Sequence, residues 1–115
     1  MSTEPILPQP AQSKPTVYVL ACRDGSLYTG ATVDLPRRLS AHRRGGAKYT
    51  RGRLPVSLMA CWHPATFAAA KSHEARFKRL RRAQKLAVIG SGEVFGCRVY
   101  SNVRAAAAYV TRVTA

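Results

Sequence analysis

The sequence predicts a small α+β domain in which a three-stranded antiparallel sheet is flanked by helices. Three observations support this fold class. Two β-branched and aromatic runs near the N-terminus are separated by an Asp-Gly pair, a third apolar run lies near the middle of the chain, and segments of helical pattern with capping residues follow the second and third runs. A chain of 115 residues suits one domain with a modest core.

A β-hairpin is expected to begin the fold. A loop of two residues, Asp24-Gly25, would place Tyr18 and Tyr28 on opposite faces, because strand side chains alternate. A three-residue loop that ends at Gly25 is the other common form, and glycine adopts the left-handed conformation that this loop needs. We favour this second register, which sets Tyr18 against Gly30 and points both tyrosines the same way. The expected strands are TVYVLAC at 16–22 and SLYTGAT at 26–32.

The first helix should follow directly. Asp34 is a suitable N-cap with a proline in the first turn, so a helix is expected over 35–44. The helix should stop at the glycine pair at 45 and 46. Arg38 and His42 are four residues apart and therefore share one face of this helix.

The middle of the chain predicts a third strand and two more helices. The alternation in PVSLMACWH predicts a strand over 55–63. Thr66 is a candidate N-cap for a helix over 66–80, and a short helix is expected around 82–89. The segment GSGEVFG at 90–96 is expected to be a loop, and a terminal helix could begin at Ser101.

This pattern divides the chain into three parts. The proline-rich residues 1–14 predict a flexible N-terminal arm. Residues 15–90 should form the folded domain. Residues 91–115 are expected to be a C-terminal extension made of a loop and a short helix.

The charge of the chain points to a polyanionic partner. Nineteen Lys and Arg residues stand against five acids, which gives a formal net charge of +14. Basic side chains on phosphates release condensed counterions, so we expect nucleic acid, with DNA favoured. A basic composition shared with the rest of an Arg-rich proteome is the alternative. We expect neither membrane association nor secretion, and a cytoplasmic location, because the N-terminus has no apolar run. Nothing indicates an oligomeric state.

Several short motifs follow one another along the chain, and their order and spacings together point to a known family. They are TVY at 16–18, YTG at 28–30, Arg38 with His42, and Glu74 within HEARFKRL. This set resembles the GIY-YIG nuclease superfamily over residues 16–89, and is most similar to its small, stand-alone bacterial members. The first triplet departs from the consensus, with Thr16 and Val17 in place of Gly and Ile. The resemblance implies a GIY-YIG-like nuclease domain over residues 15–90.

The resemblance also implies a metal site at Glu74. It suggests one divalent ion, Mg²⁺ or Mn²⁺, held by this carboxylate, and hard cations commonly take one carboxylate together with waters and substrate phosphate. The alternative is an ion pair within the helix, because Glu74 precedes Lys78 by four residues. The residues alone favour the two interpretations equally, and the resemblance favours the metal site.

The other implied site residues suit phosphodiester hydrolysis. The planar guanidinium of Arg38 fits two phosphate oxygens. The resemblance implies that Tyr18 can act as a general base and that Tyr28 positions groups by hydrogen bonding, although packing in the core is the commoner fate of a strand tyrosine. Nearby cations would lower a phenol pKa, so we expect a lowered value here. His42 could relay a proton or contact phosphate.

Basic side chains interleaved with an aromatic suit contact with a nucleic-acid strand. The loop KYTR at 48–51 also resembles a family segment close to substrate. The candidate nucleic-acid contacts are Arg44, Lys48, Tyr49, Arg51, Arg53, Lys78 and Arg82.

The leading hypothesis is therefore a metal-dependent nuclease that hydrolyses DNA, single-stranded or branched, in repair or recombination. The altered Thr16-Val17 pair motivates a second hypothesis, a nucleic-acid-binding module without catalysis. A third is an RNA- or ribosome-associated structural protein, a class in which small basic chains are frequent.

Overall fold

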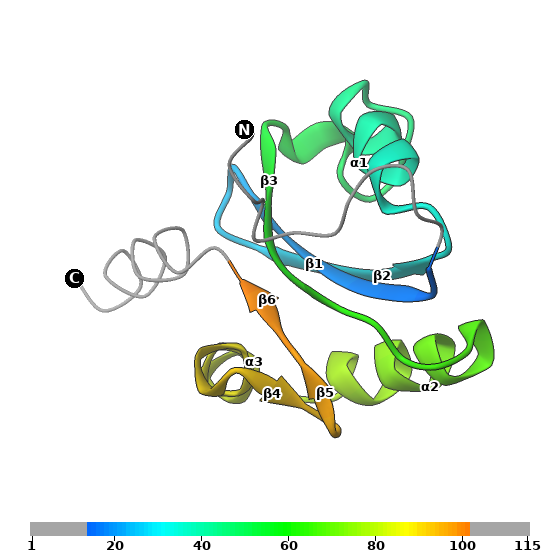
Figure 1. Cartoon of the computed structure of the whole chain (residues 1–115). Coiled ribbons are helices and arrows are strands. Elements are labelled where there is room, and N and C mark those ends of the chain that lie inside the picture. Colours follow the sequence, from blue (N-terminus) through cyan, green and yellow to red (C-terminus); the bar gives the residue numbers. More distant parts are fainter. Residues whose placement is uncertain (1–13, 102–115) are drawn as a thin grey trace, which may run out of the picture.

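The computed structural model describes residues 14–101, which form an antiparallel sheet with helices on both sides (Figure 1). The expected α+β fold is confirmed, and the three expected strands are joined at the edge by a fourth, two-residue strand. The expected arm at 1–13 and the tail beyond Ser101 lie outside the described residues. In spatial order the strands are β2 (Leu27–Thr32), β1 (Thr16–Cys22), β3 (Val56–Trp62) and β6 (Tyr100–Ser101).

The hairpin between β1 and β2 has the register that the three-residue loop predicts. Tyr18 pairs with Gly30, and the amide of Cys22 donates to the carbonyl of Ser26 at 2.9 Å. Gly25 has φ 88°, the left-handed conformation that glycine adopts without strain. Tyr18 and Tyr28 consequently lie on the same face of the sheet, and their ring centroids are 6.1 Å apart.

The helices begin at the expected caps. Asp34 Oδ1 accepts a hydrogen bond from the amide of Arg37, and Thr66 Oγ1 accepts one from the amide of Ala69. These bonds satisfy backbone donors that have no partner inside the helix. The helices are α1 (Leu35–Arg43), α2 (Phe67–Lys78) and α3 (Arg82–Ser91), with a short 3₁₀ helix η1 (Arg51–Arg53) before β3. No helix among the described residues is long and apolar enough to cross a membrane.

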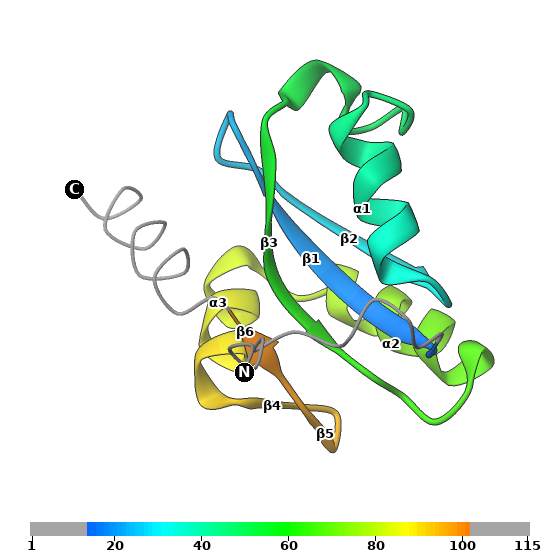
Figure 2. The same ribbon diagram turned by 45° about the horizontal axis from the view of Figure 1, so that its top comes forward.

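The two faces of the sheet carry separate helical layers. Figure 1 shows α1 above the sheet and α2 and α3 below it, and the turned view in Figure 2 shows α1 lying along β1 and β2. Side chains alternate along β1, so Val17 and Val19 pack toward α2, whereas Tyr18 and Leu20 pack toward α1. An irregularity in the β1–β3 pairing after Val19 allows consecutive residues of β3 to face the α2 side.

The segment after α3 differs from its sequence prediction. Residues 90–96 were expected to be a loop, but β4 (Glu93–Val94) and β5 (Cys97–Arg98) form a two-stranded hairpin. Phe95 and Gly96 both have positive φ, 48° and 83°, as the tight turn of a two-residue loop requires. Phenylalanine is not a typical residue for this turn, so the sequence gives no signal for it. Ser101, the candidate cap of a terminal helix, lies instead in β6.

Candidate active site

Tyr18 lies at the centre of the face that α1 covers. Its side chain is 1% exposed and crosses directly over Gly30 on β2. A Cβ atom at position 30 would stand 2.5 Å from the phenol oxygen, which is closer than any real contact allows. The glycine of the YTG triplet therefore makes room for the phenol of the neighbouring strand.

The Tyr18 hydroxyl is held by two side chains from α1. Its oxygen is 2.9 Å from Nε2 of His42 and accepts a hydrogen bond from Nε of Arg38 at 3.3 Å. The other ring nitrogen of His42, Nδ1, is 2.7 Å from Oγ1 of Thr50. We call these four residues the Tyr18 network. Because they come from β1, α1 and the loop after α1, the network forms only when these segments pack together.

The protonation states in the network follow from burial. Burial raises the pKa of Tyr18 to about 12, although its hydrogen bond from Arg38 acts in the opposite direction. The lowered tyrosine pKa expected from the net charge is thus wrong for this residue, since burial outweighs the nearby cation. Burial, and then the charge of Arg38, lower the pKa of His42, so its imidazole is neutral at neutral pH. A neutral phenol therefore faces a neutral imidazole.

Tyr28 and Tyr49 extend this site toward solvent. The Tyr28 ring lies 5.0 Å from the His42 ring and 5.3 Å from the Tyr49 ring, measured between centroids. Tyr49 is 43% exposed, and the guanidinium of Arg53 lies 4.2 Å from its centroid. The rings form a continuous row from the buried network to the partly exposed ring of Tyr49, over which the Arg53 guanidinium lies.

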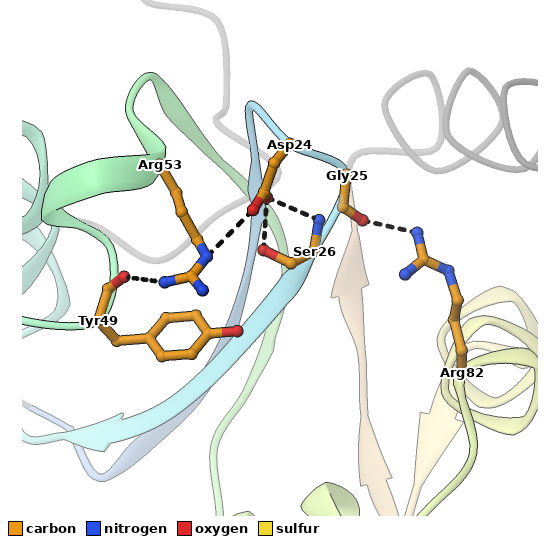
Figure 3. Close-up of polar contacts among 6 residues, drawn as sticks. All are labelled: Asp24, Gly25, Ser26, Tyr49, Arg53 and Arg82. Carbon is orange, nitrogen blue, oxygen red and sulfur yellow. Dashed lines mark hydrogen bonds and ion pairs between the residues drawn. The ribbon is translucent and has the colours of Figure 1, made fainter.

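The tip of the β1–β2 hairpin links both helical layers (Figure 3). Arg53 Nε contacts Asp24 Oδ2 at 3.0 Å, and Arg53 Nη1 donates to the carbonyl of Tyr49 at 2.6 Å. From the other layer, Arg82 Nη2 donates to the carbonyl of Gly25 at 2.6 Å. Two of the predicted nucleic-acid contacts therefore converge on this tip, one from each side.

The remaining predicted nucleic-acid contacts are exposed and lie in two places. Most of them are at the end of α1 and in the loop that follows it, where Arg44 Nη1 donates to Oγ of Ser40 at 2.7 Å. Lys78 lies on α2, on the other side of the sheet. The members of the first group are Arg44, Lys48 and Arg51.

Glu74 lies on α2, in the layer opposite the Tyr18 network. Its carboxylate contacts Nζ of Lys71 at 3.0 Å and Nζ of Lys78 at 2.8 Å, so the ion pair that the spacing favours is formed. Burial raises the pKa of Glu74, but the two ammonium groups together lower it by more, and the net shift is downward. Among residues 14–101, no hydrogen bond, ion pair or ring contact joins Glu74 to Tyr28 or to the Tyr18 network.

The surroundings of Glu74 allow a test of the metal site. No group of three His, Cys, Asp or Glu side chains within the described residues is arranged to hold an ion. A single ionised carboxylate fits a hard cation that keeps most of its waters. Both oxygens, however, already contact an ammonium group, and Oε1 is fully buried. Because the lysine side chains are 57% and 52% exposed, they have room to move away and make space for a cation.

Thr50 is the site residue that sequence reasoning missed. It belongs to the loop that resembles the family segment, but only its basic and aromatic neighbours were singled out. A threonine in a basic loop carries no signature of its own, and because Thr50 lies beyond the end of α1, no helical or strand periodicity relates it to His42. Its complete burial, at 0% exposed, appears only in the folded protein.

Comparison with known proteins identifies the family. The GIY-YIG catalytic domain matches residues 14–87. A UPF0213 protein of Streptococcus sanguinis (strain SK36) is 52% identical over 79 residues, which cover 68% of this chain and 91% of that protein. A second UPF0213 protein, of Streptococcus pneumoniae (strain R6), is 55% identical over 73 residues, which cover 63% and 74% of the two chains.

A solved structure is also similar in sequence. The solution structure of a UPF0213 protein from Bacillus halodurans shares 44% identity, covers 67% of this chain and 83% of that chain, and has a TM-score of 0.46. The domain match spans more than half of the chain and includes both triplets, Arg38, His42 and Glu74. This protein therefore belongs to the GIY-YIG family.

Proposed function

We propose that this protein is a metal-dependent nuclease that hydrolyses phosphodiester bonds in DNA. A GIY-YIG catalytic domain implies nuclease-type chemistry on nucleic acid, and the net charge of +14 suits such a substrate. The observation that carries the proposal is the Tyr18 hydroxyl, which is held between Nε of Arg38 and Nε2 of His42. A guanidinium and an imidazole that both contact one buried phenol oxygen are an arrangement that packing alone does not require.

The roles of the two tyrosines and Arg38 follow from this geometry. Nε of Arg38 holds Tyr18, and Arg38 also interacts with the side chain of Tyr28, so we expect its other guanidinium donors to turn to phosphate oxygens when a strand binds. A phosphate gripped there would lie beside the Tyr18 hydroxyl, which is placed to take a proton from the attacking water. Tyr28, between His42 and Tyr49, would position the substrate by hydrogen bonding.

Glu74 is the residue that would hold the divalent ion, Mg²⁺ or Mn²⁺. Its carboxylate is ionised, because the lysines hold its pKa below the usual range. When bound, such an ion would supply positive charge to phosphate oxygens. Because Glu74 and the Tyr18 network lie in opposite layers, the ion and the Tyr18 hydroxyl would act on one phosphate only after the substrate or α2 moves to bring them together. Lys71 and Lys78 must first leave the carboxylate, and phosphates of an incoming strand offer them alternative partners.

The exposed Tyr49 and its basic neighbours suggest which DNA is bound. Stacking on an aromatic ring requires an unpaired base, so single-stranded or branched DNA suits this surface best. Such substrates arise in repair and recombination in the cytoplasm. We also propose that residues 15–90 are the nuclease domain, with 91–115 an extension whose first part adds β6 to the sheet.

A cleavage panel tests this proposal. The purified chain would be incubated with end-labelled single-stranded, duplex and flapped DNA, with Mg²⁺, Mn²⁺ or a chelator. We expect cleavage that needs the ion and falls at least about 100-fold in Arg38→Ala and in Glu74→Ala. Products that are equal in the wild type and in both variants would show that another protein or another site is responsible.

A binding module without catalysis is the second candidate. It is favoured by the ion pairs that occupy both oxygens of Glu74. It predicts salt-sensitive retention of DNA that is equal in the wild type and in Glu74→Ala, with no cleavage products under any metal condition. The same panel, run beside a gel-shift assay over a salt series, separates the two functions.

A further inference from the structure

Thr50 uses its hydroxyl in an unusual way for its position. It is the N-cap residue of η1, where a threonine hydroxyl commonly accepts a hydrogen bond from a backbone amide of the first turn. Here the side chain makes no capping bond, and Oγ1 instead lies 2.7 Å from Nδ1 of His42. Both side chains are 0% exposed, so solvent does not compete for this contact.

The hydrogen bonds of the network indicate which nitrogen of His42 carries the proton. Arg38 has only donors, so the Tyr18 oxygen accepts from it. The hydroxyl hydrogen of Tyr18 has two polar neighbours, Nε2 of His42 at 2.9 Å and the side chain of Tyr28, and the short contact favours Nε2 as its acceptor. A neutral imidazole whose Nε2 accepts carries its hydrogen on Nδ1 and donates it to Thr50. The opposite tautomer would aim a second donor, Nε2–H, at the oxygen that already accepts from Arg38, and would turn the Tyr18 hydrogen away from His42 toward Tyr28.

We propose that Thr50 is a positioning residue that holds His42 as the Nδ1-protonated tautomer, so that Nε2 can receive the proton of Tyr18 during hydrolysis. The inference rests on the proposed nuclease function for its purpose, but the tautomer itself does not depend on that function. The hydroxyl of Thr50 is an acceptor for Nδ1–H both before and after His42 becomes charged. It therefore accepts from the neutral ring and, more strongly, from the imidazolium.

Hydrolysis by this route moves protons between water, Tyr18 and His42. The attacking water gives one proton to the Tyr18 oxygen while the original phenol proton moves to Nε2 of His42, so Tyr18 stays neutral and His42 becomes imidazolium. The water oxygen bonds to phosphorus, the bond to the leaving oxygen breaks, and the leaving oxygen takes a proton from solvent. When the product leaves, the imidazolium gives its Nε2 proton back to the Tyr18 oxygen, and Tyr18 releases its other proton to solvent, which restores a neutral phenol and a neutral imidazole. A phenol whose pKa is raised to about 12 needs such a partner, because it does not ionise by itself at neutral pH.

The protein contains a matched pair outside the site. Oγ1 of Thr16 lies 3.0 Å from Nδ1 of His63, and this threonine is 2% exposed. Thr16 also donates to the carbonyl of Lys14 at 2.8 Å, so its oxygen accepts from His63. Thr16→Val thus removes a comparable threonine–histidine bond and serves as the control for Thr50→Val.

The experiment measures the tautomer directly. Ring ¹⁵N shifts of His42 would be recorded at neutral pH in the wild type, Thr50→Val, Thr50→Ser and Thr16→Val, with folding checked by thermal unfolding. We expect an Nδ1-protonated ring in the wild type, in Thr50→Ser and in Thr16→Val. Valine has nearly the same shape but no acceptor, so Thr50→Val should shift the ring toward the Nε2-protonated form or a mixture. An Nε2-protonated ring in the wild type, or no change in Thr50→Val, would overturn the inference.

Cleavage assays on the same variants keep the two proposals apart. In Thr50→Val we expect kcat to fall about 10- to 100-fold with KM unchanged, and Thr50→Ser to restore most of it. If the tautomer shifts as expected but kcat does not fall, the relay role is overturned. If the wild type never cuts DNA yet its tautomer responds to Thr50→Val, the nuclease proposal fails and the positioning of His42 by Thr50 stands.

Discussion

The two faces of the sheet hold their polar groups in different ways. On the α1 face, Tyr18, Arg38, His42 and Thr50 are joined by hydrogen bonds across sequence separations of 24, 20 and 8 residues. On the α2 face, the carboxylate of Glu74 is paired with lysines three residues before it and four residues after it on the same helix. The first arrangement requires the complete fold, whereas the second needs only a helix.

This difference indicates which part of the site is ready for substrate. Tyr18, His42 and Thr50 of the Tyr18 network are buried and bonded to protein groups, and Arg38 is half-buried beside them, so the geometry of the network is set before any ligand binds. The lysines on Glu74 are half exposed, and ion pairs of this kind contribute little energy and exchange readily. We infer that the α1 face is preorganised and that the α2 face must rearrange to receive an ion.

The largest expected effect tests the preorganised face. Arg38→Ala should lower the cleavage rate about 100-fold or more, because it removes the donor to Tyr18 together with the phosphate contact proposed for this guanidinium. Arg38→Lys should also lose much of the rate, since an ammonium lacks the planar fork. Steady-state cleavage of labelled DNA measures both.

Arg37 is the matched control for Arg38. It is the neighbouring residue on α1 with the same charge, but it is exposed and makes no contact with Tyr18. Arg37→Ala should change the rate less than about threefold, as solvated surface charges contribute little. An equal loss in the two variants would mean that net charge, and not the Tyr18 network, governs cleavage.

The next effect concerns stability. Gly30→Ala forces a Cβ atom into the Tyr18 phenol and should reduce the free energy of unfolding by about 1–3 kcal/mol. Gly90→Ala on α3 meets no atom within 4 Å and should instead stabilise the protein by about 0.5–1 kcal/mol. Urea unfolding of both variants measures the difference. A neutral Gly30→Ala would show that the packing of Tyr18 over β2 is looser than the structure indicates.

Local patterns made the strands, the helix caps and the hairpin register predictable. The register followed from Gly25, because a left-handed third loop residue fixes the pairing and hence the shared face of the two tyrosines. The spacing of Arg38 and His42 likewise placed both on one side of α1. Each of these inferences depends only on residues that are close together in the sequence.

Tertiary contacts decided what the sequence did not reveal. Thr50 reaches His42 only because the loop after α1 folds back on the helix. The pKa of Tyr18 rose where the net charge suggested that it should fall, because burial is a property of the fold. The strand β6 is two residues long, too short for its pattern to differ from that of a loop.

The smallest expected effect concerns the α2 face, where the two lysines set the pKa of Glu74. In Lys71→Ala/Lys78→Ala, burial acts on Glu74 without opposition, so its pKa should rise above the usual value of 4.5 rather than lie below it. A carboxylate with a lowered pKa stabilises the fold above pH 4.5, and this contribution is lost as pH falls through the folded pKa. In the double variant the sign reverses, so stability should fall as pH rises from 4.5 through the raised pKa.

Carboxyl ¹³C shifts of Glu74 and urea unfolding between pH 3 and 6 measure this reversal. The two ion pairs should contribute only about 0.3–0.5 kcal/mol each at neutral pH, so the pKa is the more sensitive readout. The control Lys48→Ala/Arg51→Ala removes the same charge from the loop near the Tyr18 network and should leave the Glu74 pKa below 4.5.

If the lysines are what excludes an ion, Mn²⁺ should also bind Lys71→Ala/Lys78→Ala more tightly than the wild type. An unchanged Glu74 pKa in that variant would mean that tertiary contacts, and not the two lysines, set the charge state of this carboxylate. The α2 face would then resemble the α1 face, where tertiary contacts position the Tyr18 hydroxyl.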